Sequence, residues 1–421
     1  MTMLLTTPPR GTEVAASAPE TVSRAISPLP LYCDWPMGTR SSAELMALHL
    51  TLQLQENTLA RMIPVMAPLL GVDGLAPAAQ QAVARVFEVA RAEIPRIVRA
   101  SDRATIRAVA LHLLGDALEG MPQPLPMPAQ HNVGVVQTCD AQIDAAARAR
   151  GERMDVLLAG STWMSDVLQR SGLRNAVVYP TGIDTSLFAP GPRSGHLGQR
   201  FVIFSGGRLD YHKGQDIVLA AVKIFRKRHP ETLLLTTWQS PLPETAGSVT
   251  RSGHAPVAPE LYGTSLNISA WAVANGLPAD AIADLGHLSQ AALAVVMREA
   301  DVALFPNRAE SDMNPMVLES MASGVPVIVS QNTGHLDLAR DELCYPLVRQ
   351  GALRGVAGGS GTDGWGESSV EEVVAQLEVV YAQTGAARKR AAVAAERARA
   401  FGWALHAGRL VELLAPLSSR M

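Results

Sequence analysis

In the second half of the chain, short apolar runs alternate with longer amphipathic segments, and this order constrains the fold more than any other feature. Such runs are typical of buried strands, whereas the segments between them have the length and period of helices. Strands and helices that alternate build a parallel sheet with helices on both faces. The sequence predicts strands at 201–205, 233–238, 281–285, 302–305 and 325–330, and helices at 215–226, 289–298 and 315–322.

The first half shows the same order less regularly. Residues 29–35 are predicted to form a strand, Gly38 lies in the turn after it, and Ser41 or Ser42 can cap the next helix. A strand, a glycine-containing turn and a helix open a Rossmann-like unit. Residues 43–120 then carry mostly helical patterns, so we expect an α/β fold with an unusually helical N-terminal half. Further strands are predicted at 108–114, 132–138, 154–159 and 175–179.

Composition narrows the class of protein. A chain of 421 residues is too long for one ordinary hydrophobic core and suggests two domains. The net charge of −3 gives no sign of a nucleic-acid partner, which usually requires a basic excess. The three cysteines are far apart and odd in number, so they form neither a disulfide framework nor a metal-binding spacing. We therefore expect a reducing, cytoplasmic setting.

Two segments bear on membranes and targeting. No apolar run reaches the roughly 18–20 residues that a spanning helix needs. Residues 1–28 lack a basic segment followed by an apolar core, so we expect a disordered tail and not a signal peptide. The arginine-rich segment 386–399 is interpreted as a solvated helix face, with peripheral contact at the inner membrane face as the alternative.

A glycine-rich loop with two cations follows the strand at 201–205. Gly206 and Gly207 let the backbone approach a ligand closely, and the loop opens toward a helix start that attracts anions. Arg208 can bind two phosphate oxygens at once, whereas Lys213 acts as a movable point charge. Both would neutralise a diphosphate as it leaves. The alternative for this loop alone is a surface turn with two solvated cations.

A second polar loop follows the strand at 302–305. Asn314 is a good N-cap for the next helix, and the free amides of Met316 and Val317 would form an anion seat. Glu319 lies one turn into this helix, placed to accept hydrogen bonds from the ribose hydroxyls of a nucleoside diphosphate. Glu310 lies in the loop, nearer to a sugar attached to that diphosphate. Taken singly, either carboxylate could be an ordinary solvated group. In combination with the downstream sequence SGVPVIVS, the functional interpretation is favoured.

These motifs resemble those of the group 1 glycosyltransferases, a large family of retaining enzymes with the GT-B architecture of two facing Rossmann-like domains. Residues 206–214 (GGRLDYHKG) are similar to the family's GRL-x3-KG motif. Residues 308–328 resemble its two-glutamate motif and the EAMA-x-G-x-PVI that closes it. Residues 179–188 resemble its PNGID-x3-F, and 401–403 the aromatic start of its last helix. Roughly residues 155–415 carry the similarity.

The resemblance implies a role for each half of the chain. Residues 29–192 would bind the acceptor and 193–403 the nucleotide-sugar donor, with the Pro- and Gly-rich segment 189–195 as linker and the helix at 404–421 packing back on the first domain. It also implies roles for single residues. Arg208 and Lys213 would bind the diphosphate, Glu319 the ribose and Glu310 the transferred sugar, with Asn314, Met316 and Val317 near the phosphates.

The sequence departs from the family in the loop before the helix. The family's glutamates are commonly eight residues apart, whereas Glu310 and Glu319 are nine apart. Some relatives with an acid-Gly-Gly-x-Asn version share the longer spacing, and Asn314 fits it. Ser311 and Asp312 replace those glycines, so a bulkier and more acidic loop borders the sugar. The sugar and the base, uridine or guanosine, therefore stay open.

The N-terminal half matches the family weakly. Gly38 is the candidate for its glycine-containing first loop, and His112 is preferred to His131 for the histidine that lines the reaction centre. A histidine after an apolar run is more often a structural residue, which is the alternative for His112. Cys139 and Asp140 follow a strand where relatives keep acceptor-contacting groups.

We therefore expect a glycosyltransferase that moves a sugar from a nucleoside-diphosphate donor to a hydroxyl of a saccharide, lipid-linked or protein acceptor, as in polysaccharide, glycolipid or glycoconjugate biosynthesis. No cofactor is expected, and the absence of a suitably placed D-x-D predicts metal independence. Two alternatives stay open. One is an inactive GT-B subunit that binds a nucleotide sugar, and the other is a sugar-nucleotide epimerase, which would return epimerised donor without an acceptor.

Overall fold

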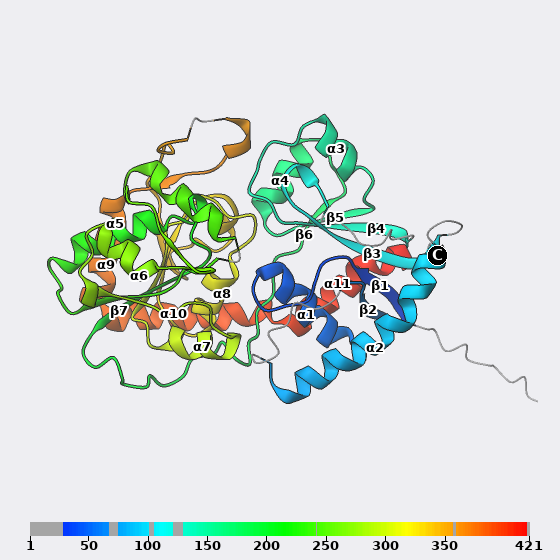
Figure 1. Cartoon of the computed structure of the whole chain (residues 1–421), viewed down its shortest axis with the longest axis horizontal. Helices are drawn as coiled ribbons and strands as arrows, with labels where there is room; N and C mark the ends of the chain where they lie inside the picture. The colour runs from blue at the N-terminus through cyan, green and yellow to red at the C-terminus, as the bar shows by residue number, and fades with distance from the viewer. Residues whose placement is uncertain are drawn as a thin grey trace, which may run out of the picture.

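The structure, a computed structural model, describes residues 28–66, 75–100, 105–120, 129–240, 242–356 and 359–418. Of the predicted tail at 1–28, only Pro28 is among them. Two six-stranded sheets form the centres of two α/β domains that lie side by side (Figure 1). All pairings within both sheets are parallel, as the alternation of strands and helices predicts.

The first sheet has the strand order β2-β1-β3-β4-β5-β6. The chain therefore runs outward in one direction from β1 and in the other from β3, and ligands of open α/β sheets bind outside the carboxyl ends of the strands at such a reversal. Its strands are β1 (Leu29–Cys33), β2 (Ala60–Pro64), β3 (Ile106–Leu114), β4 (Ala129–Val136), β5 (Val156–Ala159) and β6 (Ala176–Val178), and its helices are α1 (Ser42–Leu54), α2 (Pro77–Ala100), α3 (Ala145–Gly151) and α4 (Thr162–Arg170).

The second sheet has the order β11-β8-β7-β12-β13-β14, and its reversal lies between β7 and β12. Both polar loops singled out in the sequence therefore leave the sheet at the reversal. Its strands are β7 (Phe201–Gly206), β8 (Thr232–Thr237), β11 (Ile282–Asp284), β12 (Val302–Phe305), β13 (Val327–Ser330) and β14 (Tyr345–Leu347), and its helices are α5 (Gln215–Arg226), α6 (Ile268–Ala274), α7 (Gln290–Arg298), α8 (Pro315–Ala322) and α9 (Val370–Ala382).

Two short antiparallel pairs complete the second domain. Strands β9 (Leu261–Tyr262) and β10 (Ser265–Leu266) form one pair, and β15 (Gln350–Gly351) and β16 (Glu367–Ser368) form the other. The segment that leaves β15 and returns as β16 extends away from the sheet toward the first domain, where the amide of Ala141 donates to Gly361 O at 2.9 Å.

The helices α10 (Thr384–Ala398) and α11 (Trp403–Ser418) run from one domain to the other (Figure 1). Helix α11 packs on α1, and Trp403, Leu410 and Leu414 are buried in the same apolar cluster as Leu48. The chain crosses between the domains twice at one place, because Ile183 N donates to Phe401 O at 2.8 Å and Trp403 N donates to Ile183 O at 3.2 Å. The two crossings thus lie side by side and are joined by hydrogen bonds.

The predicted elements agree with the structure in the second half and less well at the start of the first. Strand β2 was not predicted from the helical patterns of 43–120. Its sequence, ARMIP, is interrupted by Arg61 and ends in Pro64, and it lies at the edge of the sheet, where a proline costs no ladder hydrogen bond. Edge position explains why a real strand carries so weak a pattern.

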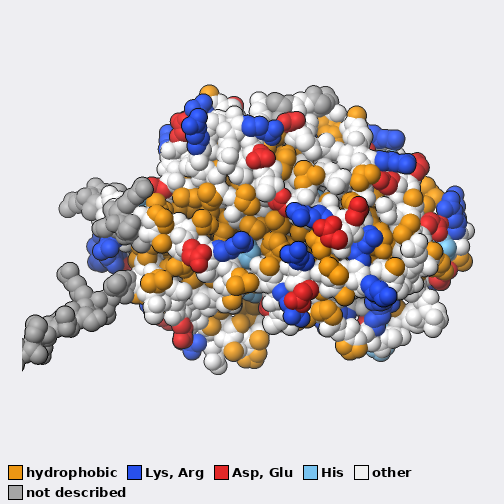
Figure 2. All heavy atoms as spheres, turned by 180° about the vertical axis from the view of Figure 1, so that it is seen from behind, with side chains coloured by type: hydrophobic (Ala, Val, Ile, Leu, Met, Phe, Trp, Pro, Cys, Tyr) orange, Lys and Arg blue, Asp and Glu red, His pale blue; other side chains and the backbone are white. Residues whose placement is uncertain are grey.

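The surface carries charges of both signs. Figure 2 shows Lys and Arg side chains interspersed with Asp and Glu over the face seen from behind. Two arginines of α10 contact their own domain: Arg388 pairs with Asp301 at 3.5 Å, and Arg390 stacks over the ring of Tyr345. Within the described residues, no helix combines the length and the apolar character that crossing a bilayer requires.

Candidate active site

A cavity of about 730 Å³ lies where the carboxyl ends of the two sheets face each other. Both domains contribute to it. The first domain supplies the loop after β1 (Thr39–Ser42), Asp116 after β3 and Gln137–Asp140 after β4. The second supplies Gly206–Arg208, Lys213, Thr237, Gly286–Leu288, Glu310–Asp312, Asn314–Met316, Glu319, Gly361, Thr362 and Trp365, among other residues.

Gly206 and Gly207, at the end of β7, are each required to be glycine for a different structural reason. Gly207 adopts a φ of 108°, which favours glycine, and a Cβ there would meet nothing within 4 Å. A Cβ on Gly206 would instead lie 2.5 Å from the sulfur of Met316. Gly206 therefore allows α8 to pack against the end of β7, and Gly207 turns the chain so that Arg208 reaches the cavity.

The guanidinium of Arg208 is held loosely at the cavity wall. Its Nη2 lies 3.4 Å from Asp210 Oδ2, and its side chain is 36% exposed. Its Nε is buried without a hydrogen-bond partner among the described residues. Burial alone would raise the pKa of Asp210, but the hydrogen bond from His212, helped by Arg208, lowers it to about 2. Arg208 can thus turn its free donors to an anion.

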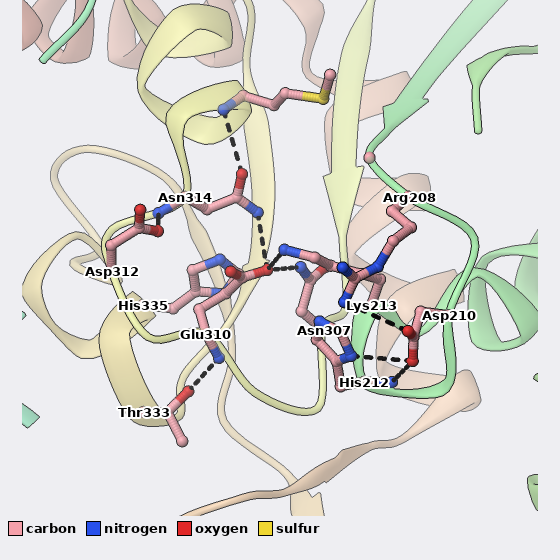
Figure 3. A network of polar contacts seen from close by, with 12 residues as sticks. Arg208, Asp210, His212, Lys213, Asn307, Glu310, Asp312, Asn314, Thr333 and His335 are labelled. Atoms are coloured by element: carbon pink, nitrogen blue, oxygen red, sulfur yellow. Dashed lines mark hydrogen bonds and ion pairs between the residues drawn. The ribbon is translucent and has the colours of Figure 1, made fainter. Parts of the chain in front are cut away.

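Lys213 and Glu310 form a close ion pair, with Nζ 2.6 Å from Oε1 (Figure 3). They come from the loops after β7 and β12, so the sheet reversal brings them together. Burial alone would raise the pKa of Glu310, but Lys213 outweighs it and holds the pKa below the ordinary value. Lys213 was predicted to act as a movable point charge, and in this structure its ammonium is paired with Glu310.

Glu310 is further oriented by amides. Asn307 Nδ2 and Asn314 Nδ2 both donate to Oε1, the latter at 3.3 Å, and the backbone amide of Glu310 donates to Thr333 Oγ1 at 2.8 Å. With Lys213, three donors therefore converge on one oxygen (Figure 3). The other oxygen, Oε2, has no partner within the part of the chain that the structure describes.

Asn314 caps α8 as the sequence predicts, but the cap uses the amides expected to be free. Its Oδ1 accepts from Met316 N at 3.1 Å, and its carbonyl accepts from Val317 N at 3.0 Å. The prediction that free amides of Met316 and Val317 form an anion-binding site is therefore wrong. Val317 is fully buried and lines no part of the cavity, whereas the Met316 side chain does. Asn314 holds the φ of 59° that this tight cap requires.

Glu319 lies where one end of the cavity meets a smaller one lined by His49, Thr181 and Trp403. It is 4% exposed, and its side chain has no hydrogen-bond or ion-pair partner in the described ranges. Burial and then the nearby charge of Asp184 raise its pKa to about 8. A buried polar group without a partner is costly. Glu319 is therefore protonated near neutral pH and well placed to meet a ligand.

Burial also changes the charge of the loop that follows Glu310. Asp312 has its pKa raised to about 6 by burial and then by the charge of Glu310. Its Oδ1 accepts from Asn314 N at 2.8 Å. His335, which hydrogen-bonds Ser330 Oγ at 2.9 Å, has its pKa lowered to about 4 by burial and stays neutral. The positive charge beside Glu310 therefore comes from Lys213.

His112 and Gly38 are not among the described residues that line the cavity. His112 Nδ1 lies 2.6 Å from Asp34 Oδ2, and Nε2 lies 2.9 Å from Asn132 Oδ1. Burial would lower its pKa, but Asp34 outweighs this and raises it. The prediction that His112 lines the reaction centre is wrong, because both ring nitrogens are engaged inside the first sheet. Gly38 is buried beneath the loop, and Thr39 and Arg40 after it line the cavity instead.

Sequence reasoning missed one group that shapes the site. Arg308 is fully buried, donates to both oxygens of Asp216 and of Glu367, and also donates to Tyr211 O at 2.6 Å. Its guanidinium lies over the Tyr211 ring, 4.1 Å from the centroid. These contacts fix the turn that carries Lys213. An arginine three residues after a buried strand was the available signal.

Cavity-lining residues outside the predicted set were also missed. Asp116 follows a strand and a glycine, which is the position where ligand-contacting groups of α/β sheets lie. Trp365 lies in a glycine-rich segment whose irregular sequence carries no element pattern. Thr237 Oγ1, at the end of β8, is buried without a partner among the described residues and faces the same cavity.

Known proteins share parts of this sequence and this architecture. Residues 200–357 match the family model for group 1 glycosyl transferases. No curated protein sequence matches the chain. Among solved structures, sucrose-phosphate synthase from Thermosynechococcus elongatus is similar with a TM-score of 0.66 at 15% identity, covering 93% of this chain and 100% of that one.

Two further structures share the fold at low identity. HepE of Anabaena in complex with UDP-glucose has a TM-score of 0.60 at 12% identity, over 92% of this chain and 99% of that chain. A putative UDP-N-acetylglucosamine 2-epimerase from Listeria monocytogenes has a TM-score of 0.50 at 11% identity, over 94% and 98%. Residues 200–357 of the second domain are thus similar to the group 1 glycosyl transferases, and the chain as a whole has the GT-B fold.

Proposed function

We propose that this protein is a retaining glycosyltransferase that moves a sugar from a nucleoside-diphosphate sugar to an acceptor hydroxyl. The observation that carries the proposal is the convergence of Arg208, Lys213 and Glu310 at the reversal of the second sheet, inside a cavity that both domains line. HepE on the same fold binds UDP-glucose, which agrees with a donor of this class.

The diphosphate would lie between the loop after β7 and the start of α8. Arg208 presents a guanidinium whose Nε has no hydrogen-bond partner among the described residues, and Lys213 supplies an ammonium that pairs with Glu310. As the bond between the anomeric carbon and the phosphate oxygen breaks, its electron pair moves to the diphosphate. Cations that are already in position stabilise this growing negative charge without reorganising.

The two glutamates would bind opposite ends of the donor. Glu319, whose side chain is without a partner among the described residues, would accept hydrogen bonds from the ribose hydroxyls. Glu310 would face the transferred sugar through Oε2, since Oε1 already receives three donors. An ionised carboxylate at that place also stabilises positive charge that develops on the anomeric carbon.

Retention follows when the acceptor attacks from the face that the diphosphate leaves. The acceptor oxygen forms the new bond to the anomeric carbon, and its proton passes to a departing phosphate oxygen. Atoms and charge then balance without a separate general base. Charge neutralisation by two side chains also supports chemistry without a metal ion.

The test is a donor screen followed by product analysis. The full chain is first screened by thermal shift against UDP, GDP, ADP and their common sugars, because a ligand that binds the folded state stabilises it more as its concentration rises over its dissociation constant. The stabilising donor is then incubated with the protein, and NMR follows the anomeric configuration of the product. A retained glycoside or slow donor hydrolysis supports the proposal, whereas epimerised donor or binding without any turnover supports the corresponding alternative.

A further inference from the structure

The cavity has two chemically different ends. At one end, Ser42 and Leu45 of the first domain meet Gln290 and Glu319, which is where the ribose is proposed to bind. At the other end, the loops after β3 and β4 meet the segment that extends between β15 and β16. The first end belongs to the donor in the function proposed above. The second end has no role in that assignment.

A chain of hydrogen bonds holds the second end together. Trp365 Nε1 donates to Cys139 O at 2.8 Å, Asp140 N donates to Thr138 Oγ1 at 2.9 Å, and Thr138 Oγ1 in turn donates to Asp116 Oδ1. Ser161 Oγ donates to Ser311 O at 2.9 Å and thereby ties the first domain to the loop after Glu310. The residues at this end therefore form an ordered wall of the cavity, to which both domains contribute.

The wall is aromatic and acidic. Trp365 presents its ring, and Asp116, Asp140 and Asp312 present carboxyl groups. Among the described lining residues of the first domain, Arg40 is the one Lys or Arg side chain, and it belongs to the loop at the ribose end. A phosphate at the Trp365 end would meet the like charges of these carboxyl groups, and the basic side chains beside it are already engaged. His212, whose ring lies 6.3 Å from that of Trp365, contacts Asp210, and Lys213 pairs with Glu310. Carboxylates that face a cavity are instead good acceptors for hydroxyl groups.

We propose that this end is an acceptor subsite for an unphosphorylated carbohydrate, which stacks a face of C–H groups on Trp365 and donates hydroxyl hydrogen bonds to Asp116 and Asp140. The proposal rests on the proposed function, because it places the acceptor beside the donor sugar. Glu310 and Asp312 line the stretch between Lys213 and this wall, so a hydroxyl of the stacked sugar would point toward the transferred sugar. The subsite thereby selects acceptors by charge as well as by shape.

The experiment compares two matched sugars on the full chain saturated with the nucleoside diphosphate that it binds. Ligand-observed saturation-transfer NMR is recorded with methyl α-glucoside and with glucose 6-phosphate at equal concentration. We expect saturation on the C–H protons of the methyl glucoside, and at least about tenfold weaker saturation for the phosphate. Trp365→Ala should weaken methyl glucoside binding by about tenfold, as expected for loss of an aromatic stacking partner.

Control variants separate this inference from the function on which it rests. Asp363→Asn changes an exposed carboxylate two residues from Trp365 that is not among the described lining residues, and it should leave the signal unchanged. Calorimetry with the nucleoside diphosphate should give the same dissociation constant for wild type and Trp365→Ala. Absence of nucleotide binding would refute the proposed function and this inference with it. Stronger saturation of glucose 6-phosphate, no signal from either sugar, or an unchanged signal in Trp365→Ala would overturn the subsite alone.

Discussion

The ammonium of Lys213 lies 2.6 Å from the carboxylate of Glu310, although 97 residues separate them in the chain. The pair is nearly enclosed, with side-chain exposures of 21% and 4%. Its position at the sheet reversal means that the same two charges serve stability in the ligand-free protein and chemistry in the proposed reaction. These two contributions can be separated by substitution.

Lys213→Met should destabilise the fold by about 3 kcal/mol, because it leaves the Glu310 carboxylate buried without its counter-charge. Adding Glu310→Gln should recover most of that loss, since an amide needs no cation. Urea denaturation of the two variants and the wild type measures the difference. Equal stability of Lys213→Met and the wild type would show that the pair contributes nothing to folding. Both variants should lack transfer activity.

Arg208→Ala should lower the turnover number by about 100- to 1,000-fold while leaving the melting temperature within a few degrees of wild type. The reason is that Arg208 is partly exposed and makes one long ion pair, so its loss costs the fold little. Donor consumption under saturating substrate measures the effect. Arg91→Ala, which removes an exposed arginine of α2, is the matched control and should keep full activity. Wild-type turnover in Arg208→Ala would rule out the assigned role.

Glu319 should link donor binding to proton release. Its pKa of about 8 lies above the ordinary value of 4.5, so the folded ligand-free protein holds an extra proton between these pH values. Stability of the ligand-free protein should therefore fall as the pH rises from about 4.5 to 8. Ribose hydroxyls favour the ionised carboxylate, and donor binding at pH 7 should release up to about one proton.

Calorimetry in buffers of different ionisation enthalpy measures that proton. The apparent binding enthalpy should depend on the buffer for wild type and not for Glu319→Gln. The variant should also bind the donor more weakly. Its free energy of unfolding should decline less than that of the wild type as the pH rises above 4.5. A buffer-independent enthalpy in the wild type would contradict the assignment of Glu319 to the ribose.

Transfer should continue undiminished in excess EDTA, because Arg208 and Lys213 are placed to neutralise the leaving diphosphate. The rate is measured with the donor that the thermal-shift screen identifies, before and after dialysis against the chelator. Added Mg²⁺ or Mn²⁺ should then raise it by less than about twofold. Loss of activity on chelation, restored by a divalent ion, would show that side-chain cations do not suffice.

Local chemistry explains which parts of this fold were predictable. The bounds of β12 and α8 match the predicted ranges, because an apolar run ends in Pro306 and Asn314-Pro315 starts the helix. Capping by Ser41 and Ser161 was likewise predictable from side chains next to the helix starts. Strand β2 was not, because its stability comes from pairing with β1 and not from its own pattern.

The candidate site likewise has features that were predictable from the sequence and features that were not. The cations and carboxylates after β7 and β12 follow from motif and spacing, because both loops leave the sheet at its reversal. The engagement of Lys213 by Glu310, of His112 by Asp34 and of Val317 N by Asn314 depends on side-chain geometry that no spacing encodes. Trp365 reaches the cavity only because its segment crosses to the first domain, which is a tertiary relation.

Arg308→Lys should impair both folding and turnover, since Arg308 holds the turn that carries Lys213. A lysine keeps the charge but cannot serve Asp216, Glu367 and the carbonyl of Tyr211 together, and the loss should cost about 3 kcal/mol or more. Acid sensitivity should change as well. Burial would raise the pKa of Glu367, but hydrogen bonds from His254 and Arg308 lower it to about 2, so this carboxylate stabilises the fold above pH 4.5 and loses that contribution as the pH falls toward 2. The wild type should therefore lose more stability between pH 4.5 and 2 than Arg308→Lys does, as urea denaturation at several pH values would show. Identical acid profiles would mean that Arg308 does not set the ionisation of Glu367.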